Sequence, residues 1–416
     1  MNETIKHRIE QIKRGEVPTG YKKSKLGVLP GDWTSMTVGE CLEKVEKPVA
    51  VEPDKLYTQI GIRSHGKGLF YKEPVSGESL GNKSVFWVEP DCFVLNIVFA
   101  WEQAIGKTTE NEIGMIGSHR FPMFRPIDNR VYIDYLISYL LTKRGTDILE
   151  FASPGGAGRN RTLGQDRFLN SKIILPTIDE QKKIAEILAT QDKVIALKEK
   201  LLQEKKTQKK YLMQQLLTGK KRLPGFTDRY FAQKMKTIIR ETSFRSNDGI
   251  NRKVMSVSNV KGFVSQTEQF DKIVASNDTS NYKIVKYGTF AYNPSRINVG
   301  SLALYKGNQE IIVSPMYSTF IALGNINMDY LLYWFKSFGF TSQLKKYLSG
   351  SVRNSLSISD LLLFDIRLPY IEEQNAIVEV LSNADKEISI IQKSIDQEKQ
   401  KKKALMQLLL TGIVRV

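Results

Sequence analysis

The chain contains one long internal repeat, and this repeat constrains its architecture more than any other feature. Residues 175–219 recur without a gap at residues 368–412, with a constant offset of 193 (369 − 176 and 412 − 219). Both copies begin with Leu-Pro-x-Ile-(Asp/Glu)-Glu-Gln and end with Leu-Met-Gln-x-Leu-Leu-Thr-Gly. Because the period is about half of the chain, the repeat predicts two pseudo-equivalent halves and excludes a solenoid of small units.

The two halves can be extended towards the N-terminus. Leu29-Pro30-Gly31 opens the first half and Leu223-Pro224-Gly225 opens the second. Each half is then a globular segment of roughly 145 residues, an ordinary domain size, followed by one long helix. The helices resemble each other closely, whereas the globular segments hardly do. A repeated scaffold with divergent globular parts suggests two related readers of two different targets.

The net charge of the chain favours a polyanionic binding partner, and its cysteine content favours a reducing compartment. The net charge is +17, from 61 Lys and Arg against 44 Asp and Glu, which raises the expectation of nucleic-acid binding. Two cysteines and three histidines provide neither a disulfide framework nor a zinc site at the usual ligand spacing. The charged N-terminus does not read as a signal peptide, and no apolar stretch is long enough to span a bilayer. We therefore expect a cytoplasmic protein.

Each repeat copy predicts a long helix that ends at Gly219 or Gly412, in the usual C-cap place. Carboxylates at Asp179 and Glu180 suit the start of a helix. Contact positions follow a 4-3 spacing over the whole helix, which is typical of a coiled-coil seam. These positions are Ile184, Leu188, Gln191, Ile195, Lys198, Leu202, Lys205, Lys209, Leu212 and Leu216 in the first copy, and Ile377, Leu381, Ala384, Ile388, Ile391, Ile395, Glu398, Lys402, Leu405 and Leu409 in the second.

Two related helices in one chain should pair with each other, and an antiparallel pair about a pseudo-twofold axis is the natural arrangement. A helix of about 38 residues is roughly 57 Å long. The pair would hold the two globular domains at a fixed distance, although helices that serve only for dimerisation are an alternative. A run of basic residues along the first helix is either a solvated face or a set of phosphate contacts. The run consists of Lys205, Lys206, Lys209, Lys210, Lys220, Lys221 and Arg222.

Both globular segments read as mixed strand and helix. A short helix is predicted at residues 134–140 in the first segment and at 329–335 in the second. Each segment ends in a polar loop rich in glycine and serine, at 153–161 and 349–355, just before its long helix. Strands are predicted at residues 57–62, 93–100 and 113–116 in the first segment, and at 253–257, 289–292, 301–305 and 311–313 in the second.

Candidate DNA contacts lie in the loops of both segments. Arg and Asn side chains pair bidentately with guanine and adenine, while glycine, hydroxyl and lysine groups suit phosphates. For each single residue a solvated turn, and for the two Gly/Ser-rich loops a flexible connector, remains the competing interpretation. The candidates are Arg63, Ser64, His65, Lys67, Trp101, Gln103, Arg159, Asn160 and Arg161 in the first segment, and Asn259, Lys261, Tyr282, Lys283, Asn293, Arg296, Asn298, Arg353 and Asn354 in the second.

Motifs for catalysis are incomplete throughout the sequence. Asn293-Pro294-Ser295-Arg296 lacks the second proline and the aromatic residue of an adenine methyltransferase pocket. Neither Asp54 nor Asp91 is followed by the Glu-x-Lys of a restriction-type nuclease centre. The glycines at 155–158 lack the lysine and hydroxyl residue of a phosphate-binding loop. With no nucleophile and base set either, the sequence argues against catalysis in this chain.

Together these motifs resemble the specificity subunits of type I restriction-modification systems. The resemblance covers nearly the whole chain and includes the paired helix starts, the paired Thr-Gly ends and the motif Leu29-Pro-Gly-Asp-Trp33. It implies two target-recognition domains, each reading half of a bipartite DNA site, and an antiparallel coiled coil that sets the spacer. It also implies that the chain is not an enzyme. Two adenine methyltransferase subunits would supply S-adenosylmethionine, and translocating nuclease subunits would use ATP and Mg.

The resemblance sets domain boundaries and a docking surface. It implies recognition domains at 29–175 and 223–368 and conserved helical regions at 176–222 and 369–416. Residues 1–28 form a basic extension that departs from this pattern, because no counterpart of similar length precedes Leu223. The extension, with Ile5, Ile9 and Ile12 on one face, would pack on the C-terminal end of the coil or touch a partner. Docking of the methyltransferase subunits predicts exposed apolar residues off the helix seam. These are Ile187, Leu197, Leu201 and Val380.

Two other functions stay open at the level of sequence. A self-contained methyltransferase or nuclease would bind S-adenosylmethionine as the purified chain. A coiled-coil scaffold would bind DNA in a salt-dependent manner without any sequence preference.

Overall fold

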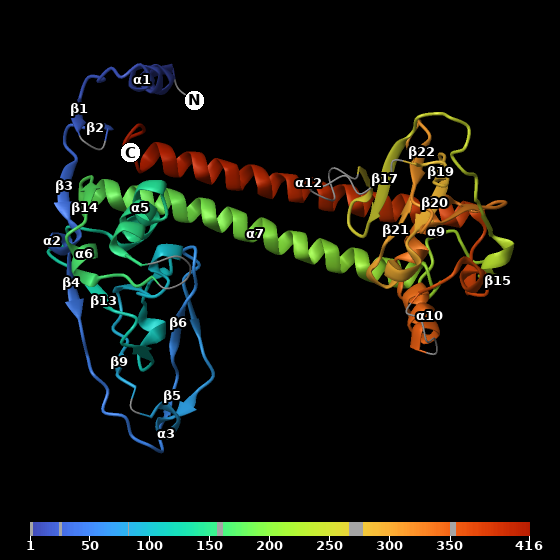
Figure 1. The fold of residues 1–416 in the computed structure, drawn as a ribbon. Coiled ribbons are helices and arrows are strands. Elements are labelled where there is room, and N and C mark those ends of the chain that lie inside the picture. Colours follow the sequence, from blue (N-terminus) through green and yellow to red (C-terminus); the bar gives the residue numbers. More distant parts are fainter. Residues whose placement is uncertain (1–2, 25–26, 82, 156–160, 266–277, 350–354) are drawn as a thin grey trace. The chain divides into compact units, whose positions relative to one another are not determined.

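Each half of the sequence forms a mixed α/β domain joined to a long helix, as predicted. The structure is a computed structural model that describes residues 3–24, 27–81, 83–155, 161–265, 278–349 and 355–416 (Figure 1). Contacts divide the chain into two units. Unit 1 comprises Met1–Lys198 and Ser394–Val416, and unit 2 comprises Glu199–Lys393. Each unit therefore contains one globular domain and a segment of both long helices.

The first half runs from the N-terminal helix to the first long helix. Its elements are α1 (Glu3–Lys13), β1 (Tyr21–Ser24), β2 (Gly27–Pro30), β3 (Thr34–Thr37), α2 (Val38–Cys41), β4 (Leu42–Val45), β5 (Leu56–Tyr57), β6 (Ile60–Ile62), β7 (Leu69–Tyr71), β8 (Val75–Ser76), α3 (Gly77–Leu80), β9 (Val85–Trp87), β10 (Phe93–Leu95), the 3₁₀ helix η1 (Ala100–Glu102), β11 (Ile105–Lys107), η2 (Glu110–Glu112), β12 (Ile116–Ser118), β13 (Met123–Pro126), α4 (Ile133–Leu140), α5 (Lys143–Ala152), α6 (Gln165–Leu169), β14 (Lys172–Leu175) and α7 (Ile178–Leu216).

The second half repeats this plan with fewer elements. It contains β15 (Phe231–Lys234), η3 (Met235–Thr237), β16 (Ile239–Glu241), β17 (Lys253–Ser258), β18 (Gly262–Ser265), β19 (Lys283–Val285), β20 (Thr289–Tyr292), η4 (Pro294–Val299), β21 (Leu302–Leu304), β22 (Ile311–Val313), β23 (Ser318–Ala322), α9 (Met328–Phe335), α10 (Phe338–Ser349), α11 (Ile358–Leu361), β24 (Asp365–Leu368) and α12 (Ile371–Leu409).

The same antiparallel four-stranded sheet lies at the centre of both units. The strand order is β11-β10-β13-β4 in unit 1 and, read in the corresponding direction, β21-β20-β23-β16 in unit 2. The central strands pair through phenylalanines, Phe93 opposite Phe124 and Phe290 opposite Phe320. Aromatic cross-strand pairs of this kind stabilise a sheet and fix its register. The two domains therefore share a fold although their sequences have diverged.

The ends of the long helices belong to the domain cores. In unit 1, Ile184 and Leu188 near the start of α7 are buried together with Leu409 at the end of α12. In unit 2 the roles are exchanged, because the start of α12 packs with Leu216 at the end of α7. Each core thus needs both helices, which ties the fold of either domain to the repeat.

Side chains at predicted seam positions of α7 pair with side chains of α12 within each unit. In unit 1, Gln191 Nε2 lies 2.8 Å from Glu398 Oε2, and Lys198 Nζ lies 2.7 Å from Ser394 Oγ. In unit 2, the two ion pairs join Lys205 to Glu387 at 2.9 Å and Lys209 to Asp385 at 2.5 Å. Residue numbers rise along α7 as their partners' numbers fall along α12, so the paired segments are antiparallel in each unit. Part of the basic run is therefore engaged in interhelical pairs.

One arginine closes the helix ends in each unit, and the two arginines are related by the repeat. Arg415 Nε lies 2.6 Å from Glu180 Oε1, and its Nη2 lies 2.7 Å from Asp32 Oδ2. In unit 2, Arg222 Nη2 lies 2.5 Å from Glu373 Oε2. Both arginines and both glutamates are separated by the repeat offset (415 − 222 and 373 − 180), so each arginine follows one long helix and binds the start of the other.

The N-terminal extension packs on the C-terminal end of the chain, which is the first of the two placements considered above. Arg8 Nη1 donates to the Ile413 carbonyl at 2.7 Å, and the Tyr21 hydroxyl donates to the Gly412 carbonyl at 2.7 Å. Gly412 has a φ of +72°, and a Cβ there would lie 2.5 Å from Pro30 Cγ. Only glycine fits this close approach after α12.

No helix in the described ranges is long and apolar enough to cross a membrane.

The predicted short helices and the strands of the second domain agree with the structure, whereas the first-domain strands need correction. The strand predicted at 57–62 is interrupted between β5 and β6, and the one at 93–100 ends at Leu95. The strand predicted at 113–116 is wrong except for its last residue. A capping box between Thr109 and Glu112 instead closes a 3₁₀ turn, which leaves Ile113 exposed.

We expect Arg415→Met to destabilise unit 1 by about 2–3 kcal/mol, because it leaves the carboxylate of Glu180, 4% exposed, without its cation. The loss should fall short of that for a fully buried pair, since the Arg415 side chain is 35% exposed. The midpoint of chemical denaturation measures it. Arg167→Met, at an exposed position of α6, is the matched control and should change stability by less than about 0.5 kcal/mol. Equal losses in both variants would contradict a stabilising role for the ion pair.

Candidate nucleic-acid interface

Two turns that are distant in the sequence meet in unit 1, next to strands β10 and β11 of the central sheet. One is the turn between β6 and β7, and the other is the 3₁₀ turn η1 between β10 and β11. The backbone amides of His65 and Gly66 donate to the carbonyls of Glu102 at 2.8 Å and Gln103 at 2.9 Å. The predicted contacts at 63–67 and at 101–103 therefore lie side by side.

Unusual backbone conformations shape this junction. His65 and Gln103 have φ values of 61° and 60°, in the left-handed region that non-glycine residues seldom occupy. Such conformations persist only where surrounding contacts hold them, and they concentrate at functional sites. Gly66 has a φ of +62°, a conformation that favours glycine, and a Cβ there would lie 2.6 Å from Leu141 Cδ2 next to α4.

Aromatic rings hold two arginine side chains of the junction in defined positions. The Arg63 guanidinium lies 4.9 Å from the Phe70 ring centroid and donates to the Leu69 carbonyl. The Arg161 guanidinium lies 5.4 Å from the Trp101 ring centroid. Stacking on a ring orients a guanidinium without neutralising it, so it can still bind a phosphate or a base edge.

Two further candidates at this junction are held by carboxylate and hydroxyl groups. Ser64 Oγ donates to Glu102 Oε2 at 3.0 Å, and Gln103 Nε2 donates to Thr146 Oγ1 on α5 at 2.6 Å. Lys67, at the tip of the turn, is exposed. The Gln103 contact links the η1 turn directly to helix α5.

Unit 2 builds the same junction from different residues. Its 3₁₀ turn η4 also follows the second strand of the sheet, and the turn between β17 and β18 lies against it. A Cβ on Gly300 would lie 3.9 Å from the Asn259 carbonyl oxygen, and Ser301 Oγ donates to the Val257 carbonyl at 3.1 Å. The four predicted residues on these two turns are exposed. They are Asn259, Lys261, Arg296 and Asn298.

A third segment reaches the junction in both units. The Leu163 amide donates to the Ile97 carbonyl at 2.8 Å, and the Leu356 amide donates to the Pro294 carbonyl at 3.0 Å. Leu163 and Leu356 are separated by the repeat offset of 193 (356 − 163). The chain that follows each Gly/Ser-rich loop thus returns to the 3₁₀ turn. Four predicted contacts in those loops lie outside the described residues: Arg159, Asn160, Arg353 and Asn354.

Three predicted contacts in unit 2 belong to the domain interior, so their predicted surface position is wrong. Tyr282 and Lys283 are buried in and beside β19, and the Lys283 ammonium donates to the Tyr317 carbonyl at 2.8 Å. Burial lowers the pKa of Lys283. Asn293 is buried as the N-cap of η4, where its Oδ1 accepts from the Ser295 amide at 3.0 Å. Charge and polarity alone could not reveal these internal partners.

Sequence reasoning missed the equivalent asparagine of unit 1. Asn96 is buried directly after β10, and its Oδ1 accepts from the Val98 amide at 3.1 Å. Asn96 and Asn293 therefore anchor corresponding turns. An asparagine that directly follows an apolar strand was the available signal in both halves.

Two of the four predicted docking residues lie exposed, and two do not. Leu197 and Leu201 on α7 are 59% and 42% exposed. Ile187 and Val380 are half-buried instead, because each packs against the core of the domain next to it. The expectation of exposure is wrong for these two residues.

Within the described ranges, no group of three or more His, Cys, Asp or Glu side chains could hold a metal ion.

Comparison with protein families agrees with this repeated geometry. The family model of the type I restriction modification DNA specificity domain matches residues 85–206 and 231–399, well over half of the chain. The chain belongs to this family. It is a non-catalytic specificity subunit of a type I restriction-modification system, and its task is DNA sequence recognition.

Relatives match over nearly their whole length. The type I restriction enzyme MjaVIII specificity subunit of Methanocaldococcus jannaschii is 24% identical over 414 residues, covering 93% of this chain and 94% of its own. The HsdS subunit from Thermoanaerobacter tengcongensis has a TM-score of 0.51 at 16% identity and covers 93% of this chain and 98% of its own. A chain from a structure on complex assembly and conformational transition of the type I restriction-modification system has a TM-score of 0.59 at 17% identity, with 93% and 99% covered. These structures support the fold.

Proposed function

We propose that this chain selects a bipartite DNA sequence, with one half-site read by each unit. The observation that carries the proposal is the repeated junction, in which the same turns meet on the same sheet but present different side chains. Unit 1 offers Arg63, Trp101 and Arg161, whereas unit 2 offers Asn259, Arg296 and Asn298. Different side chains on one scaffold suit two different half-sites, since base identity is read through side-chain hydrogen bonds at base edges. The recognition domains are residues 29–175 and 223–368.

The basic charge supports duplex binding independently of sequence. A net charge of +17 favours association with the phosphate backbone, which fixes the position of a protein on DNA. Exposed Lys67 and Lys261, at the tips of the corresponding hairpin turns, suit phosphate contacts beside the base-reading residues.

The long helices set the spacer between the half-sites. Helices α7 and α12 each contain 39 residues, which corresponds to roughly 58 Å at the usual rise per residue. Interhelical pairs in both units support an antiparallel coiled coil, with helical regions at 176–222 and 369–416. A coiled coil of fixed length would fix the number of unread base pairs.

Catalysis would be carried out by partner subunits. Two adenine methyltransferase subunits would bind S-adenosylmethionine, and restriction subunits would use ATP and Mg. Exposed Leu197 and Leu201 support a docking surface on α7, because apolar side chains on a helix face favour contact with a partner.

The proposal predicts DNA methylation that depends on this chain. In a methylation-free bacterial host that carries the neighbouring methyltransferase gene, we expect N6-methyladenine in a two-part motif with a fixed unspecified gap. Single-molecule sequencing detects the modification, and omission of this chain is the control. A soluble complex that produces no methylation would contradict the proposal and favour a scaffold with sequence-independent DNA binding.

Reading of the two half-sites should be independent. Arg296→Ala should cost about 1–3 kcal/mol in binding and relax one position of the second half-site only. Arg161→Ala is the matched variant and should affect only the first half-site. Binding to a library of duplexes, followed by sequencing of the bound fraction, measures both. A uniform loss over all sequences would identify the altered arginine as a phosphate contact.

Shortening the helix pair should shorten the spacer. Removal of residues 200–206 together with 386–392 takes one heptad, about 10 Å, from each helix and keeps the seam in phase. We expect a gap shorter by at most about three base pairs, given 3.4 Å per base pair, with both half-sites unchanged. The methylation assay reports the new motif. Altered half-sites would refute the spacer model.

A further inference from the structure

Unit 2 exposes two valines on the turns that the proposed function assigns to base reading. Val260, at the tip of the turn between β17 and β18, is 85% exposed and is the most exposed large apolar side chain among the described residues. Val299 ends the 3₁₀ turn η4 and is 51% exposed. The hydrophobic clusters that the described residues of unit 2 form include neither side chain. Their apolar surface can therefore contact a molecule that binds to these turns.

The two turns touch directly beside the valines. A Cβ on Gly300, the neighbour of Val299, would lie 3.9 Å from the carbonyl oxygen of Asn259, the neighbour of Val260. A ligand that spans this contact can therefore reach both valine side chains.

Local interactions hold the backbone around both valines. Ser258 Oγ accepts from the backbone amides of Val260 and Lys261, at 3.3 Å in each case. On the other turn, Ile297 is buried in the domain core and anchors η4 just before Val299. Valine is branched at Cβ and therefore stiff about its first side-chain torsion. A contact made by a stiff side chain on an anchored turn costs little conformational entropy.

The position that corresponds to Val299 in unit 1 carries a carboxylate. Gln103 and Gly300 both follow their 3₁₀ turns in the left-handed conformation, each seven residues after the anchoring asparagine (103 − 96 and 300 − 293). Val299 therefore corresponds to Glu102, whose Oε2 accepts from Ser64 Oγ at 3.0 Å. Because the same turn accommodates an apolar and a charged side chain, this position is better suited to distinguishing ligands than to maintaining the fold.

Polar side chains suited to DNA flank both valines along the chain. All four are exposed, and they comprise two amides and a guanidinium that can bind base edges and an ammonium that suits a phosphate. They are Asn259, Lys261, Arg296 and Asn298. In the major groove, thymine presents a C5-methyl group beside the hydrogen-bonding groups of the bases, and apolar side chains recognise that methyl group. A small apolar area within a polar reading surface matches this pattern.

We propose that Val260 and Val299 recognise the C5-methyl group of a thymine in the major groove of the second half-site. This role rests on the proposed function, in which unit 2 reads that half-site. The methyl group lies against the valine side chains, while Asn259 and Arg296 bind base edges beside it. The corresponding turn of unit 1 makes no such contact, because Glu102 offers a hydrogen-bond acceptor there instead.

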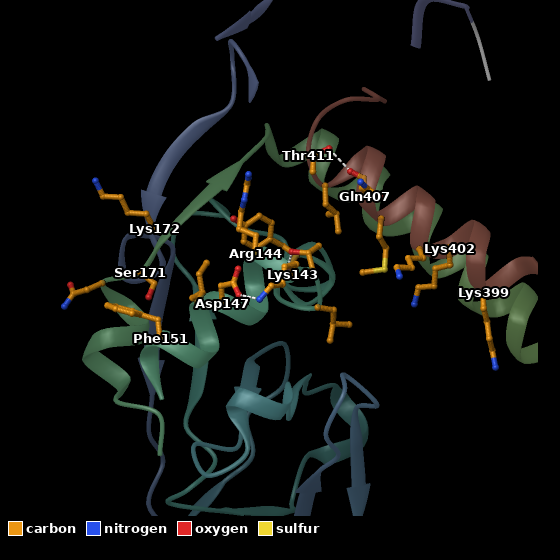
Figure 2. Close-up of a pocket in the computed structure, with 18 residues that line it drawn as sticks. Lys143, Arg144, Asp147, Phe151, Ser171, Lys172, Lys399, Lys402, Gln407 and Thr411 are labelled. Atoms are coloured by element: carbon orange, nitrogen blue, oxygen red, sulfur yellow. Dashed lines mark hydrogen bonds and ion pairs between the residues drawn. The ribbon is translucent and has the colours of Figure 1, made fainter. Parts of the chain in front are cut away.

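Base reading by these turns takes place on an open surface. The groove of 1120 Å³ in unit 1 lies between α12 and the segment from α4 to β14, and none of the described residues that line it belongs to the turns at 63–67 and 101–103 (Figure 2). The groove of 550 Å³ in unit 2 likewise has no described lining residue from 259–262 or 294–299. Exposed turns can enter the groove of an intact duplex, whereas a flipped base needs an enclosing pocket. The thymine is therefore read while it is paired.

Two other occupants fit these valines less well. Side chains that wedge between base pairs and kink DNA are typically Phe, Leu, Ile, Met or Pro rather than valine. The core of a protein interface is depleted of charged residues, whereas Lys261 and Arg296 flank the two valines. A thymine methyl group fits both the small apolar area and its polar surroundings.

Replacement of thymine by deoxyuridine tests the proposal, because it removes the methyl group and leaves the hydrogen bonds of the base pair in place. The full chain is produced with the neighbouring methyltransferase subunit, and the duplex carries the motif that the methylation assay identifies. Each thymine of the motif is replaced in turn, and competition binding gives the ratio of affinities for the thymine and uracil duplexes. We expect one position of the second half-site to lose about fourfold in affinity, the value for one buried methyl group.

Truncation of the two valines should abolish this preference. In the double variant Val260→Ala with Val299→Ala, the affinity ratio at that position should fall to about one, as expected when the apolar contact is lost. Both side chains are exposed, so the midpoint of chemical denaturation should stay close to that of the wild-type chain. Val17→Ala, at an exposed position of the N-terminal extension, is the matched control and should keep the wild-type ratio.

The outcomes distinguish the proposed function from the role of the valines. If the wild-type complex has no sequence preference at all, the proposed function fails and this role fails with it. If a motif is recognised but uracil changes the affinity at no position of the second half-site, only the role of the valines is wrong. A uracil effect that persists in the double variant would assign the methyl contact to another residue or subunit. An equal loss for thymine and uracil duplexes in the double variant would identify a wedge instead, and either of these results would overturn the proposal.

Discussion

The reciprocal binding of each long helix to the end of the other is the constraint on which the rest of the structure depends. Arg415 follows α12 and binds Glu180 at the start of α7, whereas Arg222 follows α7 and binds Glu373 at the start of α12. Carboxylates buried this deeply are costly without a cation, so each arginine fixes where the other helix begins. Each domain core is completed by leucines from both helix ends, and neither half of the sequence supplies a complete core alone.

This arrangement explains why the helices agree in sequence and the domains do not. Residues in the paired helix segments must satisfy a partner helix and a domain core at once, which restricts substitution. The central sheets need only apolar strands of the right length, such as β10 and β20, and tolerate many sequences. The turns next to the sheet have fewer packing constraints still, apart from anchoring residues such as Asn96 and Asn293. Divergence between the two domains therefore extends through sheets and turns, and it includes the turns that the proposed function assigns to base reading.

The sequence predicted the features that depend on a period or a repeat. The two long helices, the short helices α4 and α9, and strands β20 and β22 agree with the structure because local pattern decides them. Position in the interior was not predictable for polar residues, since Lys283 is satisfied by a carbonyl distant in sequence. Among the predicted contacts, Arg63, Trp101 and Arg161 come together only through the β6–β7 turn and η1, which no local pattern relates.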